Sequence, residues 1–405
     1  MTEQAKVPAI RFAGFTDPWE QRKLGELVVI ERGGSPRPID EYITDDTNGL
    51  NWVKIGDAPS LGRYISKTSE KIKPEGLSKT RQVHPGDLIL SNSMSFGRPY
   101  IMAIEGCIHD GWLLIRDEPK SFDPMYLCHM LGTPKMLNQY RMLASGSTVN
   151  NLNKELVSNA SILMPCKSEQ KVIGQFFNHL DDLITLHQRK YDKLVIFKKS
   201  MLEKMFPKDG ESVPEIRFAG FTDPWEQRKA SEVFQIVDDR GHPTLPVLSA
   251  TQNQGMIYRD DSGRYIGHDE SNEIGYKRVL PGDFVVHLRS FQGGFAHSQY
   301  EGITSPAYTV FRAKEPTSHS DRFWKHWFMS EHFIAGLSTV TYGIRDGRSI
   351  SVDEFMNTFS AFPAVEEQAA ISRLLDYLDD LITLHQRKLE LLQNIKKSLL
   401  DKMFV

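Results

Sequence analysis

Apolar or partly apolar residues recur at alternating steps of three and four along two stretches of the chain, one central and one C-terminal. The positions are Ile173, Phe176, Leu180, Leu183, His187, Lys190, Leu194, Phe197 and Met201 in the first stretch, and Ile371, Leu374, Leu378, Leu381, His385, Lys388, Leu392, Ile395 and Leu399 in the second. This spacing is typical of a coiled-coil seam, so it predicts two long amphipathic helices. Residues 180–190, LDDLITLHQRK, return letter for letter as residues 378–388, so both seams share one register.

A second apolar stripe flanks each seam and makes the apolar face wider than one partner helix covers. Its members are Phe177, Ile184 and Tyr191 in the first helix, and Leu375, Ile382 and Leu389 in the second. Ordinary core helices would show a similar stripe, but the duplicated register favours mutual packing. In an antiparallel pair, His187 and His385 would lie close together near the middle of the seam. We expect them to fix the register rather than to bind metal or catalyse.

The rest of the chain is duplicated as well. Residues 10–23, IRFAGFTDPWEQRK, form an opening motif that recurs identically at 216–229, and the helix ends KKSMLEKMF and KKSLLDKMF also match. The predicted parts are a first globular domain with its opening motif (1–166), a central long helix (167–206), a linker (207–215), a second globular domain with its opening motif (216–364) and a C-terminal long helix (365–405). This cyclic order can close with pseudo-twofold symmetry.

Each globular segment is predicted to be α+β with a mixed sheet. HPGDLILS from His84 and LPGDFVVH from Leu280 are Pro-Gly turns that lead into strands, and WLLIR and YTVFR are strands as well. Further strands are expected at SILMP and FSAFP, just before the long helices. Helices are expected from Asp123 to about Leu143 and from Asp321 to about Leu337.

Each opening motif contains an Asp-Pro-Trp-Glu sequence that is typical of a capping box. It predicts a short helix that continues to about Leu27 in the first copy and to about Phe234 in the second. Trp19 and Trp225 are expected to anchor these helices in their cores.

Composition narrows the class of protein. With 25% charged and 40% hydrophobic residues, the chain resembles globular proteins. It has no apolar run long enough for a membrane span, and MTEQAKVPAI lacks a signal-peptide core, so we expect a cytoplasmic location. Three cysteines without CxxC spacing indicate neither a disulfide framework nor a zinc site. A net charge of −3 argues against a broadly basic nucleic-acid coat but allows a local basic groove.

No catalytic motif is apparent. The chain lacks GxxxxGK[ST], HExxH, GxSxG and a credible GxGxxG, and it has no Asn- or Asp-Pro-Pro-aromatic motif. The Pro-Gly-Asp triplets are best explained as turns. Asp181-Asp182 and Asp379-Asp380 are adjacent on a helix, so their carboxylates should point apart onto a solvated or partner-facing surface. We therefore expect no catalytic residue, no cofactor and no metal ligand in this chain.

Polar, glycine-containing loops follow the Pro-Gly strands and precede the long helices at equivalent places in both halves, although their letters differ. Asn, Gln, Arg, Ser and His are the side chains that read base edges. Any one of them could be an ordinary solvent-exposed loop residue, so the prediction depends on the equivalent placement. The candidate DNA contacts are Ser91, Asn92, Ser93, Arg98, His109, Asn150, Asn151, His287, Arg289, Gln292, Tyr342, Arg345 and Arg348.

The chain resembles the specificity (S) subunits of type I restriction-modification enzymes. The resemblance rests on IRFAGFTDPWEQRKLGEL, the MPCKSEQ and FPAVEEQ approaches to the helices, LDDLITLHQRK and KKSLLDKMF, and covers essentially the whole chain. It implies two target recognition domains that each read half of a bipartite, asymmetric double-stranded DNA site. Two long antiparallel helices would hold these domains apart.

The same resemblance implies a non-catalytic subunit. Its partners would be two modification subunits, which bind S-adenosylmethionine and methylate adenine N6, and restriction (motor-nuclease) subunits that use ATP and Mg²⁺. The alternatives are a self-sufficient DNA methyltransferase or nuclease, which the missing motifs disfavour, and a coiled-coil scaffold without a DNA role.

Overall fold

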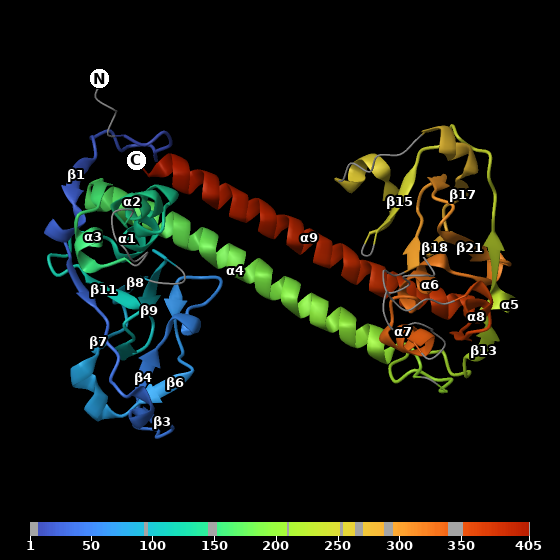
Figure 1. Cartoon of the computed structure of the whole chain (residues 1–405), viewed down its shortest axis with the longest axis horizontal. Coiled ribbons are helices and arrows are strands. Elements are labelled where there is room, and N and C mark those ends of the chain that lie inside the picture. The colour runs from blue at the N-terminus through green and yellow to red at the C-terminus, as the bar shows by residue number, and fades with distance from the viewer. Residues whose placement is uncertain are drawn as a thin grey trace. The chain divides into compact units, whose positions relative to one another are not determined.

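The computed structural model describes residues 7–92, 96–144, 152–208, 210–251, 254–263, 270–286, 295–338 and 351–404. The chain forms two compact units. Unit 1 comprises Met1–Lys190 and His385–Val405, and unit 2 comprises Tyr191–Leu384. Strands and helices occur in both units, which confirms the α+β class, and both long helices contribute to each unit (Figure 1).

In the described part of unit 1, the globular segment contains two mixed five-stranded sheets. The first has the order β3 (Ile43–Thr44), β6 (Glu70–Ile72), β4 (Leu50–Val53), β10 (Gly106–Ile108), β7 (Arg81–Val83). The second has the order β2 (Val29–Arg32), β11 (Trp112–Arg116), β8 (Leu88–Ser91), β9 (Pro99–Met102), β5 (Tyr64–Ile65). The pairs β4–β10 and β5–β9 are parallel and the others antiparallel, which confirms the predicted mixed sheet.

The predicted helix from Asp123 is interrupted in unit 1. It consists of α1 (Pro124–Leu131) and α2 (Pro134–Ala144), and Asp123 caps α1 by accepting hydrogen bonds from two backbone N–H groups. Pro134 lacks an N–H and cannot continue the preceding helix, so it begins a new one. A short helix, α3 (Lys154–Ser158), follows.

The named strand pairs of unit 2 are antiparallel over the described residues. One sheet has the order β14 (Phe234–Val237), β21 (Thr309–Ala313), β18 (Phe284–Val286), β19 (Phe295–His297). Two further pairs are β15 (Leu248–Thr251) with β16 (Gly255–Tyr258), and β17 (Lys277–Val279) with β20 (Gly302–Thr304). A parallel contact occurs only as the Val247–Ile303 bridge in this described part, so the mixed sheet expected here is not observed.

The helices of unit 2 follow the pattern of unit 1. The predicted helix from Asp321 is again divided, into α6 (Asp321–Trp327) and α7 (Glu331–Ser338), and α8 (Val352–Met356) follows. Ser330 begins α7 by accepting a hydrogen bond from the N–H of Phe333. Unit 1 uses the same kind of cap together with proline, since Thr133 accepts a hydrogen bond from the N–H of Met136 at the start of α2.

The prediction of a helix directly after each Asp-Pro-Trp-Glu box is wrong. The four residues that follow Trp19 form strand β1 (Glu20–Lys23), which pairs antiparallel with β12 (Ser161–Met164); only then comes a short 3-10 turn, Leu24–Glu26. In unit 2, β13 (Glu226–Lys229) pairs with β22 (Phe359–Phe362) before the short α5 (Ala230–Val233). Pairing with a strand more than a hundred residues away overrides the local capping signal. Both tryptophans are buried as expected.

Two long helices confirm the heptad prediction: α4 (Lys167–Lys204) and α9 (Val365–Met403). Within unit 1, Asp181 of α4 contacts Lys396 of α9, and His187 contacts His385, so the two helices are antiparallel there. The two imidazole Nδ1 atoms lie 2.8 Å apart, which confirms that the two histidines meet. Within unit 2, Lys198 of α4 contacts Asp379 of α9 at 2.5 Å, which is the equivalent contact with the helices exchanged.

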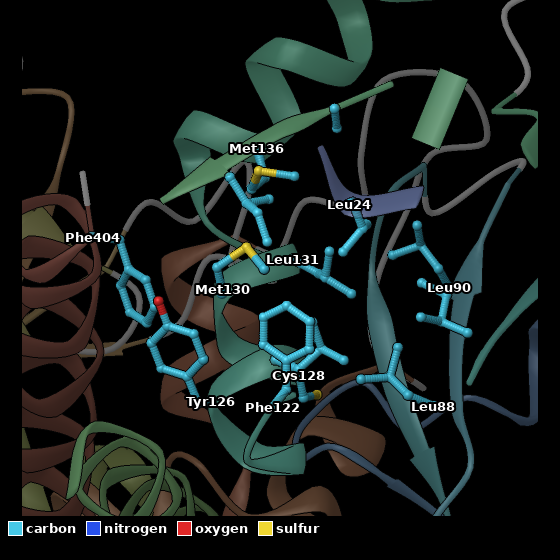
Figure 2. Packing of buried hydrophobic residues seen from close by; sticks show 14 of the residues in the cluster. Leu24, Leu88, Leu90, Phe122, Tyr126, Cys128, Met130, Leu131, Met136 and Phe404 are labelled. Atoms are coloured by element: carbon cyan, nitrogen blue, oxygen red, sulfur yellow. The ribbon is translucent and has the colours of Figure 1, made fainter. Parts of the chain in front are cut away.

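The end of each long helix closes onto an opening motif, as the cyclic order predicts. In unit 1, the backbone N–H of Ile10 donates to the carbonyl of Lys402, and in unit 2 Ile216 donates to Lys204. Figure 2 shows the Phe404 ring beside Tyr126 in the core of unit 1, with Leu88 and Leu90 on strand β8 across the same core. The last described residue of the chain thus completes the core around the first opening motif.

The flanking stripe is partly covered by the globular segments. Phe177 and Ile184 are buried in unit 1, and Leu375 is buried in unit 2. These residues pack against their own units and are not available to a partner. None of the described helices is both long and apolar enough to span a membrane.

Candidate nucleic-acid interface

Four of the predicted DNA contacts lie among the described residues: Ser91, Asn92, Arg98 and His109. The others lie outside them: Ser93, Asn150, Asn151, His287, Arg289, Gln292, Tyr342, Arg345 and Arg348. The candidate interface is therefore built from unit 1.

Ser91 and Asn92 are buried rather than exposed, with relative exposures of 0% and 3%. The Ser91 hydroxyl accepts a hydrogen bond from the backbone N–H of Arg98 at 2.9 Å. The Asn92 side-chain amide donates to the carbonyl of Asp110 at 2.8 Å. Ser91 thus satisfies a backbone group at the end of the β8–β9 hairpin, and Asn92 satisfies one in the loop between β10 and β11. The expectation that they are exposed on a loop is wrong.

Backbone contacts of Asn92 bring the two predicted loops of unit 1 together with the loop that carries His109. Asn92 donates its backbone N–H to the carbonyl of Gly111 at 2.9 Å and accepts at its own carbonyl from the N–H of Leu152 at 3.1 Å. The loop after β8, the loop between β10 and β11, and the segment that leads to α3 therefore meet at Asn92. The sequence predicted polar loops at the first and the last of these points and His109 as a candidate at the second, and the tertiary structure brings the three to one place.

His109 is held within its own loop. Its Nδ1 accepts the N–H of Gly111 at 2.9 Å, and its Nε2 lies 3.0 Å from the Asp110 carboxylate. Because both ring nitrogens are engaged, His109 orients the loop rather than offering a free nitrogen to a base. Trp112, three residues after His109, is fully buried and donates its indole N–H to the carbonyl of Val53.

The sequence did not single out the cations beside Asp110. Arg37 has an 83% exposed side chain and lies 3.9 Å from the Asp110 carboxylate, while the exposed Arg32 reaches the Asp110 carbonyl at 3.4 Å. Gly33 allows this approach, since a Cβ there would lie 2.2 Å from the His109 carbonyl oxygen. The Gly-Gly-Ser-Pro-Arg pattern after β2 was the signal available in the sequence.

Arg98 lines a hollow of about 280 Å³ between the globular segment and the long helices of unit 1. Its guanidinium lies over the Tyr100 ring and donates to the carbonyl of Ser60 at 2.6 Å. Arg63, Lys396 and Lys397 line the same hollow. Of the four predicted contacts that are described, Arg98 alone presents a cation at a concave surface.

Other clusters of titratable side chains are structural. His326, Asp376 and Asp379 of unit 2 bring possible metal-ligand atoms within 4.8 Å of one another. Lys198 and Lys325 already bind these carboxylates. Burial of Asp376 opposes ionisation, yet the bond from His326 and the charge of Lys325 hold its pKa below its usual range. We assign the cluster to ion pairing rather than to metal binding.

The Pro-Gly-Asp triplets are turns, as predicted. Asp87 accepts the N–H of His84 at 2.9 Å, and Asp283 accepts that of Leu280 at 2.8 Å. Each carboxylate also pairs with an arginine on the neighbouring strand, Arg116 or Arg312. The two aspartates thus tie a turn to a sheet in each unit, which accounts for them without catalysis.

Residues 16–195 match the family model described as the type I restriction modification DNA specificity domain. Over 95% of the chain, the sequence is 22% identical to the type I restriction enzyme MjaVIII specificity subunit of Methanocaldococcus jannaschii, 92% of which is covered. It is 21% identical to the putative MjaX specificity subunit of the same organism, with the same coverage.

Solved structures share the fold. The S subunit of a type I restriction-modification system from M. genitalium superposes with a TM-score of 0.58 at 12% identity, covering 98% of this chain and 99% of that one. A chain from a study of complex assembly in the type I R-M system gives a TM-score of 0.51 at 16% identity, covering 95% and 97%. With its duplicated α+β segments and paired long helices, the chain thus shares the fold of these solved structures, and residues 16–195 match the model of the type I restriction modification DNA specificity domain.

Proposed function

We propose that this chain is the DNA-recognition subunit of a type I restriction-modification complex and is itself non-catalytic. Each half reads one part of a bipartite, asymmetric DNA site. The observation that carries the proposal is the contrast between an identical scaffold and divergent globular segments. The opening motif and the helix centre repeat letter for letter, whereas the polar loops differ at equivalent places. Two copies of one scaffold that carry two different readers suit an asymmetric target.

The loop convergence in unit 1 supports DNA reading by the first half. Sequence readout needs several polar segments at one surface, where side chains and backbone reach base edges and phosphates together. Asn92, Asp110 and Leu152 join three such segments, and Arg32 and Arg37 add exposed positive charge beside them.

The two long helices supply the surface that recruits two modification subunits and set the distance between the half-sites. Apolar side chains stay exposed on them in both units: Leu186, Leu391 and Ile395 in unit 1, and Ile196, Phe197, Tyr377 and Leu384 in unit 2. Because Leu186 and Leu384, and likewise Phe197 and Ile395, occupy equivalent repeat positions, two copies of one partner could dock in equivalent ways. S-adenosylmethionine, ATP and Mg²⁺ belong to the partner subunits in this proposal, as do the catalytic residues.

The five-part division of the chain, with boundaries at 166, 206, 215 and 364, defines the segments to exchange. Methylome sequencing of a host that expresses the chain with its modification subunits should reveal one bipartite methylated site. Replacing residues 28–165 with the segment of another specificity subunit should change one half-site and leave the other. A change in both half-sites, or methylation without sequence preference, would reject the proposal.

The same assay tests the helices as a spacer. Four residues inserted after Leu186, and four into the equivalent position of α9, lengthen each helix by about 6 Å. The unmethylated spacer should then grow by about one to two base pairs with both half-sites retained. An unchanged spacer would show that the helices do not measure it.

A further inference from the structure

The places where the globular segments meet the long helices differ in charge between the two units. In unit 1, the hollow is lined by four cations, Arg63, Arg98, Lys396 and Lys397, and by a single carboxylate, that of Asp181. Asp181 contacts Lys396 and lies 3.5 Å from Arg63. It cannot neutralise all four cations, so the hollow has an excess of positive charge.

Two of these cations have no acidic partner among the described residues. Arg98 donates to the Ser60 carbonyl, and Lys397 forms no ion pair in the described part of the chain. The pKa of Lys396 is lowered, because burial and the nearby charge of Arg63 disfavour its protonated form more than Asp181 favours it. An anion in the hollow would relieve this repulsion.

The equivalent place in unit 2 is balanced by acids. Lys199, which corresponds to Lys397 at the repeat offset of 198, is paired with Glu331 at 2.9 Å. Asp376 binds Lys325 and Arg322, both at 3.2 Å. Unit 1 has Asn178 at the position that corresponds to Asp376. The repeat therefore supplies the same lysines to both units, and only unit 2 supplies acids for all of them.

We propose that the hollow of unit 1 binds a phosphate group of the DNA backbone, which supplies the missing negative charge. This inference rests on the proposed function, because DNA is the phosphate-bearing partner that a specificity subunit meets. The fork of Arg98 offers the planar donor geometry that phosphate oxygens accept, and Lys397 adds a point charge. A concave cationic site also concentrates the potential that attracts the DNA backbone. Contact with a phosphate adds affinity without reading a base.

The test measures how DNA binding depends on salt. The chain, assembled with its modification subunits, is titrated with a duplex that carries the site found by methylome sequencing, at several salt concentrations. Loss of one phosphate contact should reduce the slope of log affinity against log salt by about 0.9. The double variant Arg98→Ala/Lys397→Ala should show this reduction and still methylate the same sequence. Arg98→Lys/Lys397→Arg keeps both charges and should keep most of the slope.

The repeat offers a matched control. Lys199→Ala removes the equivalent lysine of unit 2, which Glu331 already neutralises, and should leave the slope unchanged. Lys199→Ala touches no buried apolar side chain, so a melting temperature equal to that of the wild type would show that the fold is retained.

Each other outcome rejects a defined part of the argument. An unchanged slope in the double variant rejects the phosphate site. If pyrophosphate raises the melting temperature of the wild type alone while the DNA slope stays unchanged, the hollow binds a free anion and not DNA. If the double variant fails to assemble with the modification subunits, an acidic group of the partner occupies the hollow. Absence of sequence-specific methylation by the wild-type complex would instead reject the proposed function.

Discussion

The two opening motifs have identical sequences but are not held identically. In both units an arginine of the motif forms a two-pronged ion pair with a buried glutamate at the start of a long helix: Arg11 with Glu169 and Arg217 with Glu367, each with its shorter contact at 2.6 Å. In unit 2, the Trp225 indole N–H also donates to Glu367 at 3.0 Å. The Trp19 indole N–H of unit 1 is buried and finds no partner among the described residues. Identical residues therefore contribute different energies, because the surrounding segments place the indole differently.

The largest expected effect is the loss of stability when Phe404 or Phe206 is replaced, and it should be equal in the two units. Phe404 packs against Trp19, Tyr126 and Phe177, and its repeat equivalent Phe206 packs against Trp225, Phe323 and Trp327. Replacing either phenylalanine by alanine should cost about 3–5 kcal/mol of the stability of its own unit, because the side chain is lost from a closed aromatic core.

Native-state hydrogen exchange measures this effect, since it reports the stability of each unit separately, which a single thermal transition does not. Phe404→Ala should lower protection in unit 1 and Phe206→Ala in unit 2, by similar amounts. The comparison would be contradicted if Phe404→Ala lowered the stability of unit 1 by less than about 1 kcal/mol while Phe206→Ala had its full effect on unit 2. Phe404 would then not complete the core of unit 1 as Phe206 completes that of unit 2.

The second prediction concerns the buried glutamates. Glu169→Ala and Glu367→Ala each leave a partly buried arginine unpaired, at a cost of about 3 kcal/mol. Glu367→Ala also leaves the Trp225 N–H unsatisfied, so it should cost about 1 kcal/mol more. Hydrogen exchange of β1 and β13, compared with that of the wild type, measures the stability lost in each variant.

Tryptophan variants provide the control for this difference. Trp225→Phe should destabilise unit 2, whereas Trp19→Phe removes an unpaired N–H and should be close to neutral apart from the lost ring volume. Equal costs for the two tryptophans would contradict the asymmetry.

The smallest expected effect concerns the contact between His187 and His385, which are equivalent residues of the two repeats. Burial, together with Lys388 and Lys190, lowers the pKa of His187, and burial, His187 and the same lysines lower that of His385. A lowered folded-state pKa means that the unfolded chain binds protons first as the pH falls through about 6.5. The stability of the helix pair should therefore be complete above pH 7 and fall between about pH 6.5 and 5.

Thermal unfolding from pH 7.5 to 5 tests this direction. The double variant His187→Leu/His385→Leu should raise the melting temperature and flatten its pH dependence, while His84→Ala, an exposed histidine, should leave the profile as in the wild type. A wild-type melting temperature that rises as the pH falls would contradict the lowered pKa values.

The elements that could be predicted were those with a long period or a repeated sequence. Each heptad pattern extends over about eight turns of helix, from Ile173 to Met201 and from Ile371 to Leu399, so it is visible in the sequence alone. The repeat placed His187 opposite His385 once the helices were antiparallel. The interface was predicted less well. Ser91 and Asn92 have the polar side chains of a DNA-reading loop, but those side chains bond to backbone groups of Arg98 and Asp110. Nothing local distinguishes these two uses of a polar residue.

Periodicity, internal identity and missing motifs were sufficient to establish the helix pair, the two α+β segments and the absence of a recognisable catalytic motif, because each is a property of the linear order of residues. The strand after each Asp-Pro-Trp-Glu box, the pairing of Arg11 with Glu169, and the acids that neutralise Lys199 but not Lys397 depend on residues far apart in the chain. Strand pairing and ion pairing are decided by which groups fold into contact, and a single sequence does not list its long-range neighbours. Only the three-dimensional arrangement therefore shows where equivalent residues of the two repeats form different hydrogen bonds and ion pairs.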